Sequence, residues 1–163
     1  MEKDYSYINN VPVKIKKVHE KAIIPQYQRE GDAGFDFHAL IDNEIGYVVV
    51  EPKDQIVIRT GISCSIPRGY EIQVRPRSGL AFKHKITITN SPGTIDFGFK
   101  IPNEILVIIY NLSDEKFKIS NRDRIAQGVL KKVEKAVFEE VFEESEDDKM
   151  RNRGGGFGST GLK

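Results

Sequence analysis

Apolar and polar residues alternate with a period of two along much of the chain. Segments 11–15 and 70–75 follow this alternation, and segments 55–59 and 86–89 are rich in β-branched residues. Both patterns predict β-strands, because successive side chains of a strand point to opposite faces. Segment 104–110 is almost continuously apolar, which is typical of a strand buried on both faces.

Turn residues separate these segments at intervals of about 8–12 residues, a spacing typical of sandwiches, jelly rolls and barrels. The turns include Gly31, Gly46, Gly61, Pro67-Arg-Gly69 and Pro92-Gly93. One short helix is predicted over residues 78–84, with Ser78 as its N-cap. The pattern therefore predicts an all-β domain with one short helix.

The composition changes after Phe142. Residues 143–148 are acidic, and residues 151–161 are rich in glycine. Such composition is typical of a solvated linker and a flexible tail. The tail also contains two arginines and a phenylalanine, which a lid over a nucleotide would need. We therefore expect a β-domain over 1–142, and an acidic linker with a glycine-rich C-terminal lid over 143–163.

The overall composition limits the possible partners. The 163 residues carry a formal net charge of +1, whereas proteins that wrap nucleic acid usually have a clear basic excess. No apolar run approaches the ~20 residues of a membrane span, and the N-terminus does not resemble a secretory signal. The single cysteine, Cys64, suits a reducing compartment. We expect a cytoplasmic protein that binds neither nucleic acid nor a membrane.

Five short segments place polar residues or glycine where a strand pattern would otherwise continue. They are Ala33-Gly-Phe-Asp36, Arg75-Pro-Arg-Ser-Gly-Leu-Ala81, Asn90-Ser-Pro-Gly-Thr-Ile-Asp-Phe-Gly-Phe99, Asp123-Arg-Ile-Ala-Gln127 and Arg153-Gly-Gly-Gly-Phe-Gly-Ser-Thr-Gly161. Singly, each has an ordinary structural interpretation, such as a turn aspartate or a helix cap. Together and in this order, they resemble the five motifs of the homotrimeric dUTP diphosphatase (dUTPase) family, over about Val13 to Leu162.

The resemblance implies a distorted jelly-roll fold and a homotrimer whose active sites are shared between subunits. It implies hydrolysis of dUTP to dUMP and pyrophosphate, which limits uracil in DNA and supplies dUMP for thymidylate synthesis. It also implies a Mg²⁺ ion carried by the triphosphate without a direct protein ligand, with Asp36 and Gln127 near its water molecules.

The resemblance further assigns roles to the motif residues. Asp96 would be the carboxylate that orients or deprotonates the attacking water, with Asp36 and Ser78 completing the catalytic set. A β-hairpin in the third segment would recognise the nucleoside through Asn90, Gly93, Thr94, Ile95, Asp96 and Phe99. The phosphates and the closing lid would be contacted by Arg77, Ser78, Gly79, Gln127, Arg153, Phe157, Gly158, Ser159 and Thr160, and the ring of Phe157 would stack on uracil.

Three features depart from the family pattern. Phe99 stands where the family usually has a tyrosine under the deoxyribose, so the ring is kept and the hydroxyl is lost. The link Phe99-Lys-Ile-Pro-Asn-Glu104 is longer than usual, and we expect a bulge or a wider turn there. Arg153 precedes Phe157 by four residues where the family has five, which leaves Arg151 as an alternative phosphate ligand.

Two other functions are compatible with parts of the pattern. A dCTP deaminase of the same fold would need a glutamate in the strand after the third segment, and Leu106-Val-Ile-Ile-Tyr110 contains no acid. A regulatory nucleotide-binding protein would not need the complete set of motif residues. The sequence does not distinguish a cellular from a viral source, and a viral protein would act in the host cytoplasm or nucleus.

Overall fold

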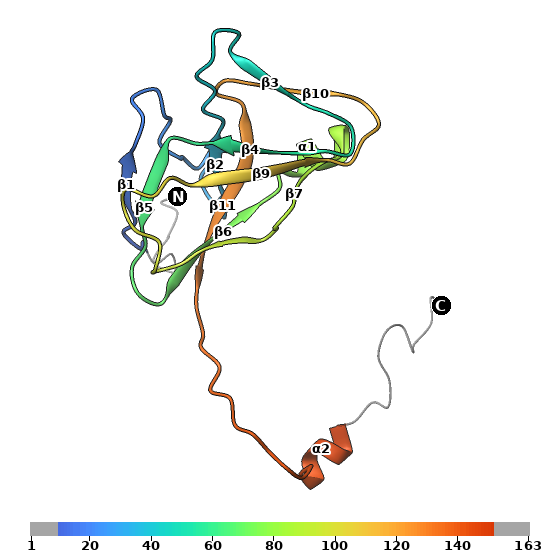
Figure 1. Cartoon of the computed structure of the whole chain (residues 1–163). Helices are drawn as coiled ribbons and strands as arrows, with labels where there is room; N and C mark the ends of the chain where they lie inside the picture. The colour runs from blue at the N-terminus through green and yellow to red at the C-terminus, as the bar shows by residue number, and fades with distance from the viewer. Residues whose placement is uncertain (1–9, 152–163) are drawn as a thin grey trace, which may run out of the picture.

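The computed structural model describes residues 10–151 of the chain. Within this range, short antiparallel strands form a body of jelly-roll type, which confirms the all-β prediction (Figure 1). The larger sheet contains, in spatial order, β2 (Phe35–His38), β11 (Arg124–Lys132), β6 (Tyr70–Arg75) and β8 (Gly93–Ile95). The second sheet contains β4 (Gln55–Arg59), β9 (Leu106–Asn111) and β7 (Ile86–Ile88). Two ribbons pair β1 (Lys14–Lys17) with β5 (Ile62–Ser65), and β3 (Tyr47–Val50) with β10 (Phe117–Ser120).

The predicted strands form near their expected positions, but β1 covers Lys14–Lys17 rather than 11–15, β9 covers Leu106–Asn111 rather than 104–110, and the burial of β9 differs. β4 and β6 have the predicted bounds, and β7 ends one residue earlier than expected. Segment 104–110 was predicted to be buried on both faces. In β9, however, Val107 and Ile109 are buried, whereas Leu106 is 50% exposed. The prediction was wrong because the chain covers only one face of this sheet with its own residues.

The core between the sheets is mainly aliphatic, and most of its buried polar side chains are paired, whereas Ser63 Oγ has no hydrogen-bond partner among residues 10–151. Asn111 is fully buried on β9, and its Nδ2 donates to the carbonyl oxygens of Val50 and Glu115 at 3.1 and 2.7 Å. These bonds tie the second sheet to the β3–β10 ribbon and satisfy a polar group that would be costly to bury alone. Burial raises the pKa of the Cys64 thiol to about 11, so this cysteine is a neutral core residue.

The predicted helix forms, but a different residue caps it. α1 (Ser78–His84) has Arg77 at the N-cap position without a side-chain capping bond, so Ser78 is the first helical residue rather than the cap. The helix ends at Lys85, whose φ is 56°. Its backbone N–H donates to the carbonyls of Ala81 and Leu80, as in the usual left-handed C-cap.

A second helix forms in the segment that the sequence predicted to be a solvated linker. α2 (Glu146–Arg151) is a short helix in which Lys149 Nζ donates to Glu146 Oε1 at 2.9 Å. Glu146, Lys149 and Met150 are good helix formers, and the i,i+3 ion pair adds a few tenths of a kcal/mol at most. None of the helices in residues 10–151 is long and apolar enough to cross a membrane.

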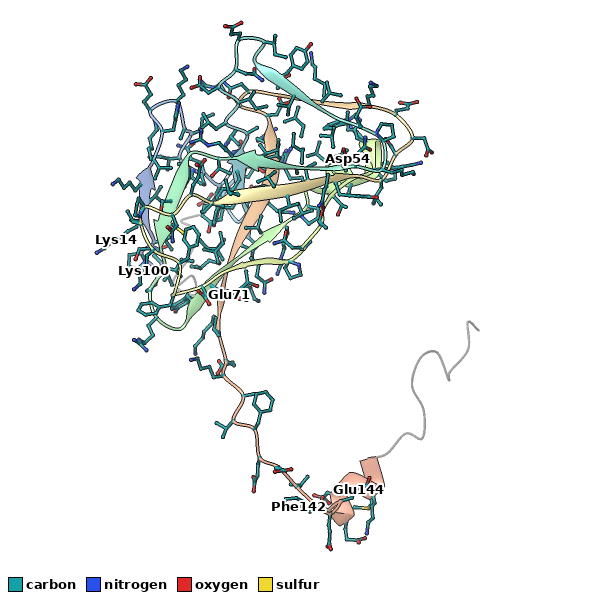
Figure 2. The ribbon with its side chains drawn as sticks, in the orientation of Figure 1. Lys14, Asp54, Glu71, Lys100, Phe142 and Glu144 are labelled. Carbon is teal, nitrogen blue, oxygen red and sulfur yellow. The ribbon has the colours of Figure 1, made fainter. Side chains whose placement is uncertain are left out.

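The chain leaves the β body immediately after β11. Val133 N–H donates to the Gly69 carbonyl at 2.9 Å, and the following residues run outward to α2 (Figure 1). We call residues 134–151 the arm, which therefore starts before residue 143. Figure 2 shows Phe142 and Glu144 on this segment, well away from the body. Five large apolar side chains of the arm are between 71% and 96% exposed: Val137, Phe138, Val141, Phe142 and Met150.

The third motif segment connects the two sheets. β7 pairs with β9, whereas β8, the one strand within segment 90–99, pairs with β6. The segment therefore does not fold into the expected hairpin of its own. After β8, two successive turns lead toward β9. They are closed by the Phe99 N–H to the Asp96 carbonyl at 3.1 Å and by the Asn103 N–H to the Lys100 carbonyl at 2.8 Å. This confirms the wider turn expected for the longer link.

Gly128 allows β11 to cross the phenylalanine rings of β2. A Cβ at this position would lie 2.6 Å from Phe35 Cζ and 2.8 Å from Phe37 Cε2. The two rings pack edge to face with centroids 5.5 Å apart, and Phe37 is buried in the core. Only glycine fits here without moving a ring, because protein interiors are close-packed.

We predict that Gly128→Ala lowers the free energy of unfolding by about 1–3 kcal/mol, the usual cost of overpacking a core. Chemical denaturation measures this change. Gly79→Ala is the matched control, since a Cβ there would have no neighbour within 4 Å, and alanine is a better helix former than glycine. Equal stability of Gly128→Ala and the unmodified protein would contradict the packing argument.

Candidate active site

Polar residues from several elements meet in a cleft of about 640 Å³ on one face of the larger sheet. Asp36 of β2, Gln127 of β11 and Arg75 of β6 form a row across the sheet, and directly paired residues share a face. Ser78 and Gly79 join the lining where the chain enters α1. We call this the arginine cleft, because four arginines line it: Arg29, Arg75, Arg77 and Arg124.

The carboxylate of Asp36 is the fixed point of the arginine cleft. Its side chain is only 9% exposed; Oδ1 accepts from Arg77 Nε at 2.9 Å and Oδ2 from Arg124 Nη1 at 3.2 Å. Arg77 Nη1 also donates to the carbonyl oxygen of Arg124 at 3.1 Å. A guanidinium has five N–H donors, so both arginines keep donors for a ligand. One buried carboxylate thus positions two cations.

Gln127 is positioned from two sides. Its Nε2 donates to the Pro76 carbonyl at 2.8 Å, which ties β11 to the link between β6 and α1. A Cβ on residue 34 would lie 2.7 Å from Gln127 Oε1, so Gly34 leaves the space that this amide occupies. Gly34 of the first motif segment therefore provides the space for the Gln127 side chain of the fourth segment.

Arg75 is held by a row of polar side chains on β6. Its Nε donates to Gln73 Oε1 at 3.2 Å, its Nη2 bonds to the same oxygen, and Gln73 Nε2 donates to Glu71 Oε1 at 2.6 Å. Residues 71, 73 and 75 share a face because strand side chains alternate. The row presents the Arg75 guanidinium to the cleft at the end of the strand.

His38 lies two residues after Asp36 on β2. Its Nδ1 is buried and has no hydrogen-bond partner among residues 10–151. Burial lowers the pKa of His38 and the neighbouring arginines lower it further, while Asp36 opposes the shift. The environment therefore favours the neutral form of His38.

A second cleft, of about 250 Å³, lies beside β8 and has a mostly apolar lining. We call it the apolar cleft. The predicted nucleoside-binding residues that line it are Asn90, Gly93, Thr94, Ile95 and Phe99. Asn90 Nδ2 lies 3.2 Å from the place of a Cβ on Gly93. A glycine at this position lets the Asn90 amide approach the strand closely.

Asp96 directly follows β8 and is exposed. Its Oδ1 accepts the Gly98 N–H at 2.8 Å, which closes an Asx turn. Its Oδ2 has no hydrogen-bond partner in the part of the chain that the structure describes. The Arg68 guanidinium lies 4.7 Å from the centre of the Phe97 ring, a cation–π contact that fastens this turn to the one between β5 and β6.

The arginine cleft and the apolar cleft lie on opposite faces of the larger sheet. Val74 and Arg75 are consecutive on β6, so their side chains point to opposite faces. Val74 lines the apolar cleft and Arg75 the arginine cleft. Val74 pairs with Gly93, and Arg75 pairs with Gln127. Within one chain the sheet therefore separates the predicted phosphate-binding residues from the predicted nucleoside-binding residues, and Asp96 lines neither cleft.

The arginine cleft contains residues that the sequence analysis did not assign. Arg75 and Arg124 stand inside the second and fourth motif segments, next to residues that were assigned. Arg29 lies in the loop before the first motif, where no pattern marked it. The predicted tail residues lie outside the described part of the chain: Arg153, Phe157, Gly158, Ser159 and Thr160.

The acidic side chains of the arginine cleft are already bonded to other groups, so they are poorly placed to bind a metal ion directly. In residues 10–151, no three His, Cys, Asp or Glu side chains gather as a metal site would require. Both oxygens of Asp36 bond arginines, and Asp32 Oδ2 accepts the Arg29 N–H at 2.9 Å. A Mg²⁺ ion in this cleft would take most of its oxygen ligands from a bound anion and from water.

Comparison with known sequences identifies the family of the chain. The dUTPase family model matches residues 20–161. The deoxyuridine 5′-triphosphate nucleotidohydrolase of Helicobacter pylori strain J99 is 49% identical over 150 residues, covering 92% of this chain and 97% of the relative. The enzyme of the same name from Syntrophotalea carbinolica is 47% identical over 155 residues, covering 95% of this chain and 100% of the relative.

Solved structures resemble the fold closely. A variant of the Staphylococcus bacteriophage 80alpha dUTPase with dUpNHpp has a TM-score of 0.74 at 26% identity, covering 93% of this chain and 99% of that chain. The dUTPase from phage phi11 of S. aureus, in a structure that describes coordination of a structural Mg(II) ion, has a TM-score of 0.71 at 23% identity, covering 82% and 98%. The chain belongs to the dUTPase family.

Proposed function

We propose that this chain is a dUTP diphosphatase, which hydrolyses dUTP to dUMP and pyrophosphate. The observation that carries the proposal is the pair of clefts built from the family's motif segments, one rich in arginine and one mostly apolar. A nucleoside triphosphate has an anionic end and an apolar end that match them. Relatives named deoxyuridine 5′-triphosphate nucleotidohydrolases cover nearly the whole chain. The reaction limits uracil in DNA and supplies dUMP, and we place it in the cytoplasm.

The apolar cleft is the proposed nucleoside site. Asn90 and the backbone between Gly93 and Phe99 bond the edge of uracil, and the Phe99 ring packs against the deoxyribose. Fixed donors and acceptors reject cytosine, because an unpaired buried polar group costs about 1–3 kcal/mol. Phe99 is half-buried and lines the cleft, so the ring can exclude a ribose without the hydroxyl that the family usually has there.

The arginine cleft is the proposed triphosphate site. Arg77, Gln127 and the backbone at Ser78 and Gly79 bind phosphate oxygens, since free N–H groups and guanidinium donors favour anions. Mg²⁺ bound with the substrate would neutralise charge on the phosphate oxygens. Asp36 keeps Arg77 in place and, with Gln127, lies near the water molecules of the ion.

Asp96 is the proposed catalytic carboxylate. Attack on the α-phosphorus needs an oriented water and a group that accepts its proton. The Asx turn fixes one oxygen of Asp96 and leaves Oδ2 without a partner among the described residues. A rigid carboxylate with one unused oxygen beside the nucleoside site suits both requirements. Ser78, on the phosphate side, completes the proposed catalytic set.

The surroundings of Glu104 argue against the alternative of a dCTP deaminase. Glu104 is a carboxylate that lines the apolar cleft. Its oxygens accept from Arg59 Nε at 3.0 and 3.2 Å and from the Gly61 N–H at 2.7 Å. This carboxylate is paired with a cation and a backbone donor, so it is poorly suited to carry protons to and from a base.

Three features support a trimer with shared sites. The two clefts face opposite sides of one sheet, so a substrate that fills both must contact two chains. The outer face of the second sheet exposes Val57 and Leu106, at 53% and 50%. The arm exposes Phe138 and Phe142, at 94% and 90%. Apolar surface of this extent is typical of interfaces between subunits.

The glycine-rich tail is proposed to close over the bound nucleotide as a lid. Phe157 stacks on uracil, and Arg153, or Arg151 in its place, engages the phosphates together with Gly158, Ser159 and Thr160. Apart from Arg151, these residues lie outside the described part of the chain, and the proposal rests on the resemblance of their sequence to the family motif. Protease protection of residues 151–163 by dUpNHpp with Mg²⁺ tests it, and equal cleavage with and without the ligand would reject it.

We predict that the protein releases pyrophosphate rapidly from dUTP and at least about 100-fold more slowly from dCTP, dTTP and UTP. A binding site discriminates to this extent against analogues that leave its polar groups unpaired. Removing Mg²⁺ with a chelator should reduce the rate on dUTP. Release of ammonia from dCTP would instead identify a deaminase. Binding of dUTP without turnover would identify a regulatory protein.

We predict that Asp96→Asn reduces turnover of dUTP by at least about 100-fold, the usual contribution of general base catalysis. The amide keeps the size of the side chain and can still accept the Gly98 N–H, so the turn should persist. Calorimetry should give an affinity for dUpNHpp within a few-fold of the unmodified enzyme. Asp96→Asn turnover close to that of the unmodified enzyme would exclude Asp96 as the base.

Mixing two inactive variants tests whether sites are shared. Asp96→Asn damages the nucleoside side and Arg77→Gln the phosphate side. In randomly mixed trimers about a quarter of the sites should have both sides intact, and activity should recover to about that fraction. Asp96→Asn mixed with Asn90→Ala is the control, because both changes damage the same side and should restore nothing. No recovery in mixed trimers, with mixing verified by co-purification of two tags, would place the whole site in one chain.

A further inference from the structure

Arg29 is the one arginine of the arginine cleft without an assigned task. Arg75 is bonded to Gln73, and both Arg77 and Arg124 are bonded to Asp36. The guanidinium of Arg29 has no hydrogen bond or ion pair with any residue in the described range 10–151. A cation that lines a cleft and has no partner there is available to an anionic ligand.

The backbone that carries Arg29 is nevertheless well fixed. Its N–H donates to Asp32 Oδ2 at 2.9 Å, the Asp32 N–H donates back to the Arg29 carbonyl at 3.2 Å, and Gly31 takes a φ of 88° between them. The Asp36 N–H donates to the Gln26 carbonyl at 3.2 Å, which attaches this loop to β2. Asp32 is thereby occupied with the backbone, and the loop presents the Arg29 side chain at a defined place.

Exposure rises from the floor of the cleft to its opening. The side chain of Asp36 is 9% exposed, those of Arg77 and Arg124 are 27% and 43% exposed, and Arg29 is an exposed residue. A short phosphate chain that binds the floor cations need not extend to the opening. A longer chain does extend there, and its last phosphate carries the most charge.

We propose that Arg29 binds the terminal phosphate of the nucleotide and makes the enzyme selective for triphosphates over shorter phosphate chains. This inference rests on the proposed function and adds a specificity-determining residue to it. The floor cations bind any phosphate that enters, so they contribute about equally to all nucleotides. Arg29 contributes only when the chain is long enough to reach it, and a guanidinium can bind a phosphate through two N–H groups at once.

Calorimetric titrations with dUMP, dUDP and dUpNHpp, each with Mg²⁺, test the proposal. Arg29→Gln should weaken dUpNHpp binding about 5- to 20-fold, the range for a charge-assisted contact at a partly exposed site. The same variant should bind dUMP within about twofold of the unmodified enzyme, because dUMP lacks the terminal phosphate. Arg29→Lys should restore part of the loss, since a lysine keeps the charge but cannot bond in the same bidentate way.

Lys16→Gln is the matched control, because it removes one positive charge from an exposed strand residue outside the cleft. It should leave the affinity for all three nucleotides unchanged. Thermal unfolding of Arg29→Gln should match that of the unmodified enzyme. Equal weakening for all three nucleotides, or none for dUpNHpp, would overturn the role of Arg29. Absence of dUTP hydrolysis by the unmodified enzyme would instead overturn the proposed function, so the two failures are distinguishable.

Discussion

The buried Asp36 carboxylate between two arginines is the interaction on which the rest of the site depends. It links three parts of the chain that are far apart in sequence: strand β2, the start of α1 at Arg77, and the start of β11 at Arg124. A buried carboxylate without a cation is strongly unfavourable, so the ion pairs and the local packing require one another. The same contact leaves a net positive charge facing the cleft. Asp36 is therefore both a structural tie and the reason why the arginines are already positioned before a ligand arrives.

The alternation of side chains along β6 explains why one chain holds two separate clefts. Val74 contributes to the apolar cleft and Arg75 to the arginine cleft, although they are neighbours in sequence. One strand can thus contribute side chains to two different clefts, because its alternate residues face opposite sides of the sheet. The proposed nucleoside side and the proposed phosphate side therefore face different directions, which is the reason for proposing that several chains complete one site.

Features outside the family motifs shape the surroundings of the site in this chain. The Arg68 guanidinium on the Phe97 ring connects the turn that carries Asp96 to the β5–β6 turn. The longer link after Phe99 is accommodated by a second turn, closed by the Asn103 N–H to the Lys100 carbonyl. These contacts hold the turns that follow β8, and the turn at Lys100–Asn103 satisfies its backbone groups locally.

The sequence by itself determined several of the elements and the family. Alternation located β6 and a β-branched run located β4, because strand patterns act over a few residues. Asp36, Asp96 and Gln127 were assigned through the resemblance of the ordered motif segments to the family. Only the tertiary structure decided which side chains meet. The pairing of Asp36 with both arginines, and the engagement of Glu104 by Arg59, join residues more than forty positions apart. The sequence also could not reveal Arg29, whose importance comes only from the cleft it lines. The burial of β9 was also mispredicted from the sequence. An apolar strand sequence indicates that the strand will be covered, but not whether its own chain or a neighbouring chain covers it.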